Sequence, residues 1–238
     1  MEFLTEAISW FLDPANWSGR DGIPVRVGQH VSLSFVSIII AVAIALPVGL
    51  ILGHARRAEG VVIGFANLGR ALPSLAILLI FLPVVGIGDP LVVVAMVVLA
   101  IPPILVNAAV AVREVDRELV EAARGMGMSG VQVLRRVEIP VGLPLIFTGI
   151  RVAAVQVVAT LTLGALVAGG GLGRFIVDGL ALRDNGKLVA GALLVALLAV
   201  ATERVFSLLE RRATLPGSGP RALAPADLAS PSAQPMVP

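Results

Sequence analysis

Three glycines in the middle of the chain have the spacing of a dinucleotide-binding loop, Gly125-x-Gly127-x-x-Gly130. In a dinucleotide-binding fold these glycines follow a β-strand, and an acidic residue about 20 positions further on binds the ribose. Here the residues before Gly125 have the apolar spacing of an amphipathic helix, and no acidic residue follows at that distance. We therefore reject a dinucleotide site and interpret the glycines as a turn between two helices.

The residue types that other chemistry would need are missing or wrongly spaced. The single lysine, Lys187, lacks the upstream glycine and the following Ser or Thr of a phosphate-binding loop, so we expect no ATP hydrolysis in this chain. There is no cysteine, and His30 and His54 have no ligand spacing, so we interpret both as interfacial polar residues. We expect no catalytic residue, metal or cofactor in this chain.

The chain is far too apolar for a soluble domain of its size. Of its 238 residues, 57% are hydrophobic and 14% are charged, and the mean hydropathy is +0.96. Apolar runs long enough to cross a bilayer alternate with polar segments. The five runs are 31–53, 71–88, 91–112, 143–168 and 188–209. The sequence therefore predicts an all-α, polytopic membrane protein with five core transmembrane helices, with Arg70 just before the second run and Arg151 inside the fourth.

The residues that flank these runs complete the predicted domain organisation. We expect an external interfacial segment at 1–26, a transmembrane domain at 27–212, and a disordered cytoplasmic tail rich in Pro, Ala and Ser at 213–238. An apolar stripe that ends before Asp13-Pro14 predicts an interfacial helix at the start of the chain. Trp10 and Trp17 would then lie at the level of the lipid headgroups.

Basic residues predict how the spans are oriented. With the polar segment 114–140 placed in the cytoplasm, eleven of the 18 basic residues fall on the cytoplasmic side and five outside, leaving aside Arg70 and Arg151. Because positive charge favours the cytoplasmic side, we expect the N-terminus outside and the C-terminus inside. An odd number of spans, five, requires the two ends to lie on opposite sides of the membrane, which agrees with this orientation.

No Asp, Glu or His lies in the middle of a predicted span. A self-sufficient ion-coupled carrier would usually place such a group there, because buried charges are costly and are kept for function. We therefore expect the energy for transport to come from another protein. A self-sufficient carrier or channel stays open as an alternative class, and a membrane-embedded enzyme is a more remote one.

The polar segment predicts two helices joined by a tight turn. Val115, Leu119, Ala122 and Met126 recur at helical spacing, with charged residues on the other faces. Gly127 tolerates the left-handed conformation that often ends a helix. Ser129 has capping-box spacing to Gln132, so a second short helix should begin there and end before Pro140. Such a compact polar protrusion suits docking to a partner.

This segment resembles the signature loop of binding-protein-dependent ATP-binding-cassette importer permeases. The shared order is Glu-Ala-Ala, three residues, Gly, nine residues, then apolar-x-apolar-Pro. It falls on Glu121, Ala122, Ala123, Gly127, Val137, Ile139 and Pro140, with Gly125, Ser129 and Arg135 between them. The resemblance implies that these residues form a coupling helix that fits a groove on the ATPase subunit. Any cytoplasmic loop can be an amphipathic helix, but the glycine and proline at these offsets favour the signature.

The same resemblance implies the partners and the location. They are two cytoplasmic ATPase subunits that hold ATP and Mg²⁺, a second permease chain that is identical or paralogous, and an extracytoplasmic substrate-binding protein. The chain would be a multi-pass protein of the bacterial cell membrane, surrounded by lipid, and the net charge of +2 gives no reason to expect nucleic acid.

More detailed motifs resemble the permeases for glycine betaine, proline betaine, choline and carnitine. They are Leu72 to Ala76, Glu121 to Met128, Gly149 to Arg151, Gly169 to Gly173, and Gly191-Ala192. Methionine-importer permeases resemble the Gly169 to Gly173 stretch nearly as well, so methionine or another small solute stays open. Where family members often have Gln-Thr, this chain has Arg70-Ala71, and a pore role for that pair is therefore in doubt.

The sequence identifies residues along the transport path less clearly than it identifies the signature loop. The chain has no tyrosine and only two tryptophans, both near its start, so an aromatic cage for a quaternary ammonium is not expected within the spans. The external binding protein would then select the solute, and this chain would supply a path that binds the solute only weakly. Path candidates are Pro73, Ser74, Pro102, Asn107, Thr160 and Thr162, for which ordinary helix packing is the alternative. Gly169, Gly170, Gly171 and Gly173 predict a flexible external turn rather than a ligand contact.

Overall fold

The computed structural model describes residues 2–56, 59–71 and 73–213, and these residues form helices and connecting turns without a strand. The helices are α1 (Glu2–Leu12), α2 (Ile23–Ala55), α3 (Glu59–Ala71), α4 (Ser74–Val85), α5 (Asp89–Arg113), α6 (Arg117–Gly125), α7 (Gly130–Val133), α8 (Ile139–Thr160), α9 (Gly173–Leu182) and α10 (Asn185–Ala213). Short 3₁₀ segments at Pro14–Trp17 and Leu161–Val167, and a π-helical segment at Leu134–Glu138, connect some of them. The all-α fold predicted from the sequence is confirmed.

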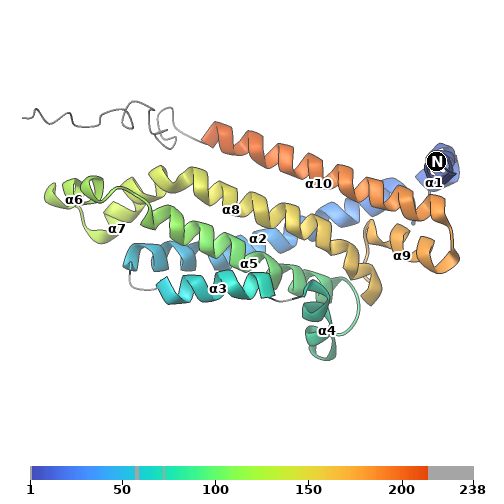
Figure 1. Ribbon diagram of the computed structural model, residues 1–238, viewed down its shortest axis with the longest axis horizontal. Coiled ribbons are helices and arrows are strands. Elements are labelled where there is room, and N and C mark those ends of the chain that lie inside the picture. Colours follow the sequence, from blue (N-terminus) through green and yellow to red (C-terminus); the bar gives the residue numbers. More distant parts are fainter. Residues whose placement is uncertain (1, 57–58, 72, 214–238) are drawn as a thin grey trace, which may run out of the picture.

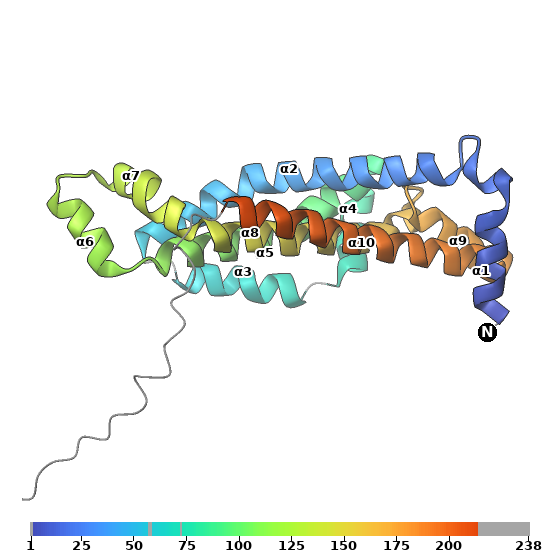
Figure 2. The ribbon, with the colours of Figure 1, turned by 90° about the horizontal axis from the view of Figure 1, so that it is seen from above.

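The long helices lie side by side in an elongated bundle (Figure 1). Helix α5 packs between α2 and α8, and α10 packs against α8 and α9. Helices α6 and α7 protrude at one end, which we call the docking end, and α1 crosses α10 at the opposite end (Figure 2). The bundle therefore separates a protruding helical pair from the glycine turn at 169–173 by its full length.

Four described helical stretches are long and apolar enough to cross a membrane. They are Ile23–Ala55, Asp89–Arg113, Gly130–Val167 and Asn185–Arg212. The second predicted span is not one helix, because the chain forms α3, breaks before Pro73, and continues as α4 for 12 residues. Proline lacks the N–H that a continuous helix would need, which explains why one helix does not run through Pro73. Part of the predicted tail, 214–238, lies outside the described residues, as do 57–58 and 72.

Helix α5 is the most enclosed element of the bundle. Leu91, Val92 and Leu105 are at most 2% exposed and belong to one apolar core that α2, α4, α5 and α8 share. Glycines allow its neighbours to approach closely: a Cβ built on Gly49 of α2 would lie 2.6 Å from the Leu105 carbonyl oxygen. Small residues at helix contacts are how membrane helices gain close packing. The fold is therefore built around backbone-to-backbone contact with α5.

This contact generates a stability prediction. Gly49→Ala should destabilise the protein by about 1–3 kcal/mol, because a methyl group at that position overlaps the α5 backbone. Gly28→Ala in the same helix is the matched control, since nothing lies within 4 Å of its Cβ position. Unfolding of the detergent-solubilised protein would measure both variants. Equal stability of the two would contradict the close α2–α5 contact.

Candidate functional site

The protruding pair at the docking end has well-formed helix ends. Asp116 caps α6, its Oδ1 accepting a hydrogen bond from the Glu118 backbone N–H at 2.8 Å. Gly127 has a φ of +82°, the left-handed conformation expected from the sequence. Ser129 and Gln132 form the predicted capping box at the start of α7, with Ser129 N–H donating to the Gln132 side chain at 2.7 Å. Gly127 and Ser129 therefore set the turn between α6 and α7.

A small apolar core of its own stabilises this pair. Val115, Val120, Ala123 and Val133 are all at most 4% exposed and pack together, apart from the main core of the bundle. Met128 and Val137 pack against them. Because α6, α7 and the π segment all contribute, they form one packed unit, which we call the docking segment (116–138).

The docking segment exposes apolar side chains. Met126 is 73% exposed, Val131 63% and Leu119 45%, and Ala122 is also exposed. The sequence placed Val115, Leu119, Ala122 and Met126 on one apolar face, but of these the structure buries only Val115. Val120 and Ala123 occupy the buried face of α6 instead. Apolar side chains left exposed on a protruding, otherwise charged helix are typical of a surface that contacts another protein.

The remaining predicted coupling residues surround this surface. Glu121, Gly125, Gly127, Ser129 and Arg135 are exposed, and Val137 and Pro140 are half-buried. The structure thus places most of the predicted coupling loop on one protrusion.

The predicted end of the second helix before Pro140 is wrong. Leu134–Glu138 forms a π-helical turn, and α8 begins directly at Ile139 with Pro140 in its first turn. Proline is tolerated in the first turn of a helix, and a π turn is a common place for a helix to absorb an irregularity. The docking segment is therefore continuous with the membrane-spanning α8.

A buried carboxylate in the π turn was not predicted from the sequence. Glu138 is 1% exposed, and its Oε2 lies 2.5 Å from Nδ1 of His54 at the end of α2. The residues around His54 in the sequence give no sign of this partner, because Glu138 lies 84 positions away. The prediction from the sequence was therefore an isolated interfacial residue. Only the three-dimensional packing of α2 against the π turn brings the two together.

The six path candidates come from three separate parts of the chain. Pro73 and Ser74 lie at the start of α4, Pro102 and Asn107 on α5, Thr160 at the end of α8 and Thr162 in the 3₁₀ segment that follows it. Asn107 Nδ2 donates to the Pro103 carbonyl at 2.8 Å and Thr162 Oγ1 to the Ala159 carbonyl at 2.9 Å. Both bonds stay within the local backbone, as is common for polar residues in membrane helices. Their role in a path stays a prediction.

The glycine turn is anchored by side chains from two other helices. Gly170 N–H donates to Asp89 Oδ1 at 2.7 Å, and Gly171 N–H donates to Gln29 Oε1 at 3.1 Å. Gly171 has a φ of +90°, which favours glycine, and a Cβ on Gly173 would overlap the Thr162 carbonyl. Gly169 N–H donates to the Gly164 carbonyl in the preceding 3₁₀ segment. The sequence predicted the turn but not its anchors, Asp89 and Gln29.

His30 is a third anchor. Its Nδ1 accepts a hydrogen bond from Leu172 N–H at 3.2 Å, so its Nε2 carries the hydrogen and donates to the Val158 carbonyl at 2.9 Å. The ring is fully buried within the protein, so His30 is a structural anchor rather than an isolated residue. Burial of a polar ring is favourable here because both nitrogens are bonded.

Charged residues also connect α8 to α10. Arg151 lies 3.5 Å from Glu203 and 3.2 Å from Glu210, and Thr148 Oγ1 donates to Glu210 at 3.1 Å. Pairing of this kind lowers the cost of charged groups in an apolar helix.

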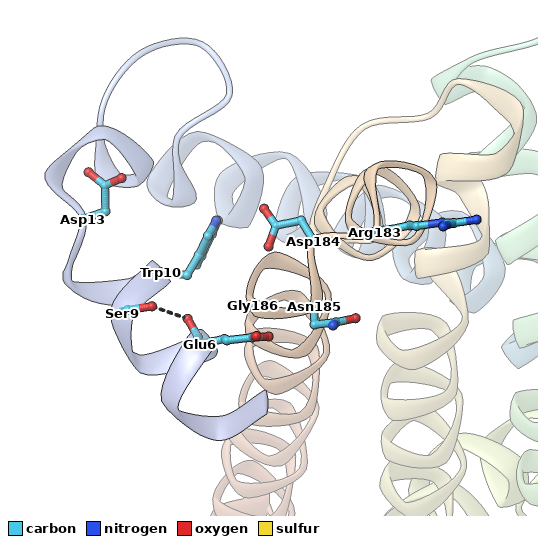
Figure 3. Close-up of a pocket in the computed structure, with 8 residues that line it drawn as sticks. All are labelled: Glu6, Ser9, Trp10, Asp13, Arg183, Asp184, Asn185 and Gly186. Atoms are coloured by element: carbon cyan, nitrogen blue, oxygen red, sulfur yellow. Dashed lines mark hydrogen bonds between the residues drawn. The ribbon is translucent and has the colours of Figure 1, made fainter. Parts of the chain in front are cut away.

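A polar cavity lies at the opposite end, where α1 meets the α9–α10 connection (Figure 3). Its volume is about 370 Å³, and its walls include Glu6, Ser9, Trp10 and Asp184. Trp10 packs edge-to-face against Phe175. None of the predicted site residues lines this cavity, so it is separate from both the docking segment and the path candidates.

Comparison with known proteins shows the family of the chain. A family model described as "Binding-protein-dependent transport system inner membrane component" matches residues 45–215. The match covers more than half of the chain, which therefore belongs to this family of ATP-binding-cassette importer permeases. It is a multi-pass inner-membrane transport subunit rather than an enzyme, and the resemblance predicted from the sequence is confirmed. Membership also implies a binding-protein partner.

Individual relatives are similar over most of their length. The glycine betaine/carnitine/choline transport system permease protein OpuCB of Bacillus subtilis is 35% identical over 81% of this chain and 88% of its own. The carnitine transport permease protein OpuCB of Listeria monocytogenes is 38% identical over 80% and 87%. The MetNI methionine ABC transporter, in an inward-facing conformation, has a chain 25% identical, with a TM-score of 0.71 over 79% of this chain and 94% of its own.

The turn between α6 and α7 gives a test of the docking segment's geometry. Gly127→Ala should destabilise the segment by about 1–2 kcal/mol, since a side chain is unfavourable in the left-handed conformation. Gly125→Ala is the matched control: both positions are exposed with free space around the Cβ, but Gly125 lies inside a helix. Amide hydrogen exchange across residues 116–138 would report the difference. Equal protection in the two variants would contradict the turn.

Proposed function

We propose that this chain is the permease of an importer for quaternary-ammonium osmoprotectants of the glycine betaine, choline and carnitine class. The observation that carries this substrate class is the similarity to several relatives named for those solutes, at 35 to 38% identity over about four fifths of the chain. The likeness to the methionine transporter is at 25% identity and supports the fold more than the solute.

In this proposal the docking segment binds a cytoplasmic ATPase subunit. Its exposed apolar surface at Leu119, Ala122 and Met126, beside Glu121, supports such a contact, because it lies on a packed protrusion at one end of the bundle. ATP and Mg²⁺ would be held by the partner. The docking end then faces the cytoplasm, which puts the N-terminus outside and the C-terminus inside.

A complete transporter needs further subunits in addition to this one. We propose a second permease chain, identical or paralogous, and an extracytoplasmic binding protein that selects the solute. The lack of tyrosine and the position of both tryptophans, at 10 and 17, support selection outside the membrane helices.

Substitution of Met126 tests the docking contact. Met126→Asp should reduce association with the ATPase subunit by at least about tenfold, because a buried unpaired charge in an interface is costly. Leu182→Asp is the control, since Leu182 is 72% exposed, close to the 73% of Met126, but lies at the opposite end of the bundle. Co-purification from membranes measures both. Normal association of the Met126 variant would remove the docking role from this surface.

Reconstitution tests the class of transporter and the solute together. Liposomes with this chain alone should show no uptake of radiolabelled choline or glycine betaine. Addition of the ATPase, the binding protein, ATP and, if the second permease is a paralogue, that chain should give uptake that methionine does not inhibit. Uptake without the ATPase would identify a self-sufficient carrier, and uptake of methionine in place of choline would refute the solute class while leaving the importer intact.

A further inference from the structure

Both histidines of the chain lie in α2, one near each end of the helix. His54 is in the last turn, at the docking end, and His30 lies near the start, beside the glycine turn. Each makes a hydrogen bond to a segment more than 80 positions away. Helix α2 is therefore held at both ends by long-range polar contacts.

At the docking end, the contact is to the π turn. The His54 ring lies against Glu138, and a Cβ on Gly130 would lie 3.3 Å from its Nε2. One imidazole thus contacts Glu138 at the end of the π turn and lies close to Gly130 at the start of α7. A carboxylate as buried as Glu138 is costly without a partner, so this contact strongly favours one relative position of α2 and the π turn.

At the other end, α2 holds the glycine turn. Gln29 and His30 accept hydrogen bonds from two successive backbone N–H groups, those of Gly171 and Leu172. His30 also donates to the Val158 carbonyl on α8. Displacement of this end of α2 would have to break these bonds or carry the turn with it.

Between its two ends α2 is one uninterrupted helix. It has 33 residues, which at about 1.5 Å per residue makes it about 50 Å long. Pro47 lies inside it without ending it. Apart from the one bond that Pro47 cannot donate, backbone hydrogen bonds hold each turn of α2 on the next, so the helix can transmit displacement along its axis.

We propose that α2 couples the docking segment to the glycine turn, with His54 and Glu138 as the positioning pair at the docking end. Movement of the docking segment is passed through this pair to α2, and through Gln29 and His30 to the turn. The inference rests on the proposed function in one respect, that an ATPase moves the docking segment.

The natural lack of cysteine provides the experiment. Ala168→Cys places a reporter next to the glycine turn, at an exposed residue that lines an open cavity of about 440 Å³ with Arg26, Gln29 and Asp89. The complete transporter in nanodiscs, where both faces are accessible, is labelled with a polar maleimide. We expect the labelling rate of the permease to change at least about fivefold between the nucleotide-free and the ATP–vanadate-trapped states, the lower end of usual coupling between sites.

Glu138→Ala should abolish this change while the assembly still hydrolyses ATP. Glu138→Gln should retain it, because the amide still bonds to the imidazole. Glu203→Gln is the matched control: it removes an ion pair with Arg151 between α8 and α10 and leaves both ends of α2 untouched. A full response in the Glu138→Ala variant, or its loss in Glu203→Gln, would overturn the proposal.

A second variant serves if Glu138→Ala does not assemble. The double change His54→Leu and Glu138→Leu replaces both polar groups by apolar ones, which is usually tolerated in a buried site. It should assemble and lose the response, and a retained response would refute the pair's role. The readout uses no transported solute, so a wrong solute class leaves it unaffected. If the ATPase does not bind the permease, the proposed function is refuted. If the ATPase binds and is trapped with vanadate, but labelling does not change in the transporter that keeps His54 and Glu138, only the coupling is refuted.

Discussion

Close backbone contact with α5 is the constraint on which the rest of the structure depends. Lipid offers no hydrophobic drive to bring apolar helices together, so these helices gain contact by fitting small residues against one another. Gly49 and Gly53 of α2, and Gly142 and Gly149 of α8, each face α5 in this way. The positions of α2 and α8 are thereby fixed on opposite sides of one helix. The positions of the docking segment and the glycine turn depend in turn on those two helices, which contact them.

Polar groups in the bundle follow from the same constraint. Within the described helices, hydroxyl and amide groups such as those of Ser37, Asn107 and Thr202 bond to a carbonyl four residues earlier, which satisfies them without a partner helix. The long-range bonds lie near the ends of the bundle, at Gln29, His30, Asp89 and the pair of His54 with Glu138, and between α8 and α10, where Arg151 and Thr148 pair with glutamates. The contacts of α2 and α8 with α5 thus depend on shape, and directed bonds add to them at the ends of the bundle and between α8 and α10.

The sequence predicted features that depend on local chemistry. The apolar runs, the left-handed Gly127, the Ser129 cap and the glycine turn each have a signal within a few residues, and the family signature located the docking segment. Features that depend on long-range packing had no such signal. The buried face of α6 was misassigned because Val120 is buried only through contact with Val133 and Val115. His30 and His54 seemed isolated because their partners lie far along the chain, and the break at Pro73 was masked by an otherwise apolar run.

The π turn between the docking segment and α8 has a consequence for how such proteins diverge. A π turn is an α-helix with one residue inserted, and its wider turn absorbs that residue. Loss of one residue from Leu134–Glu138 would restore a regular helix and remove the wide turn that carries Glu138, while α8 kept its register in the membrane. One codon can thus change the junction with the cytoplasmic protrusion without altering the transmembrane body.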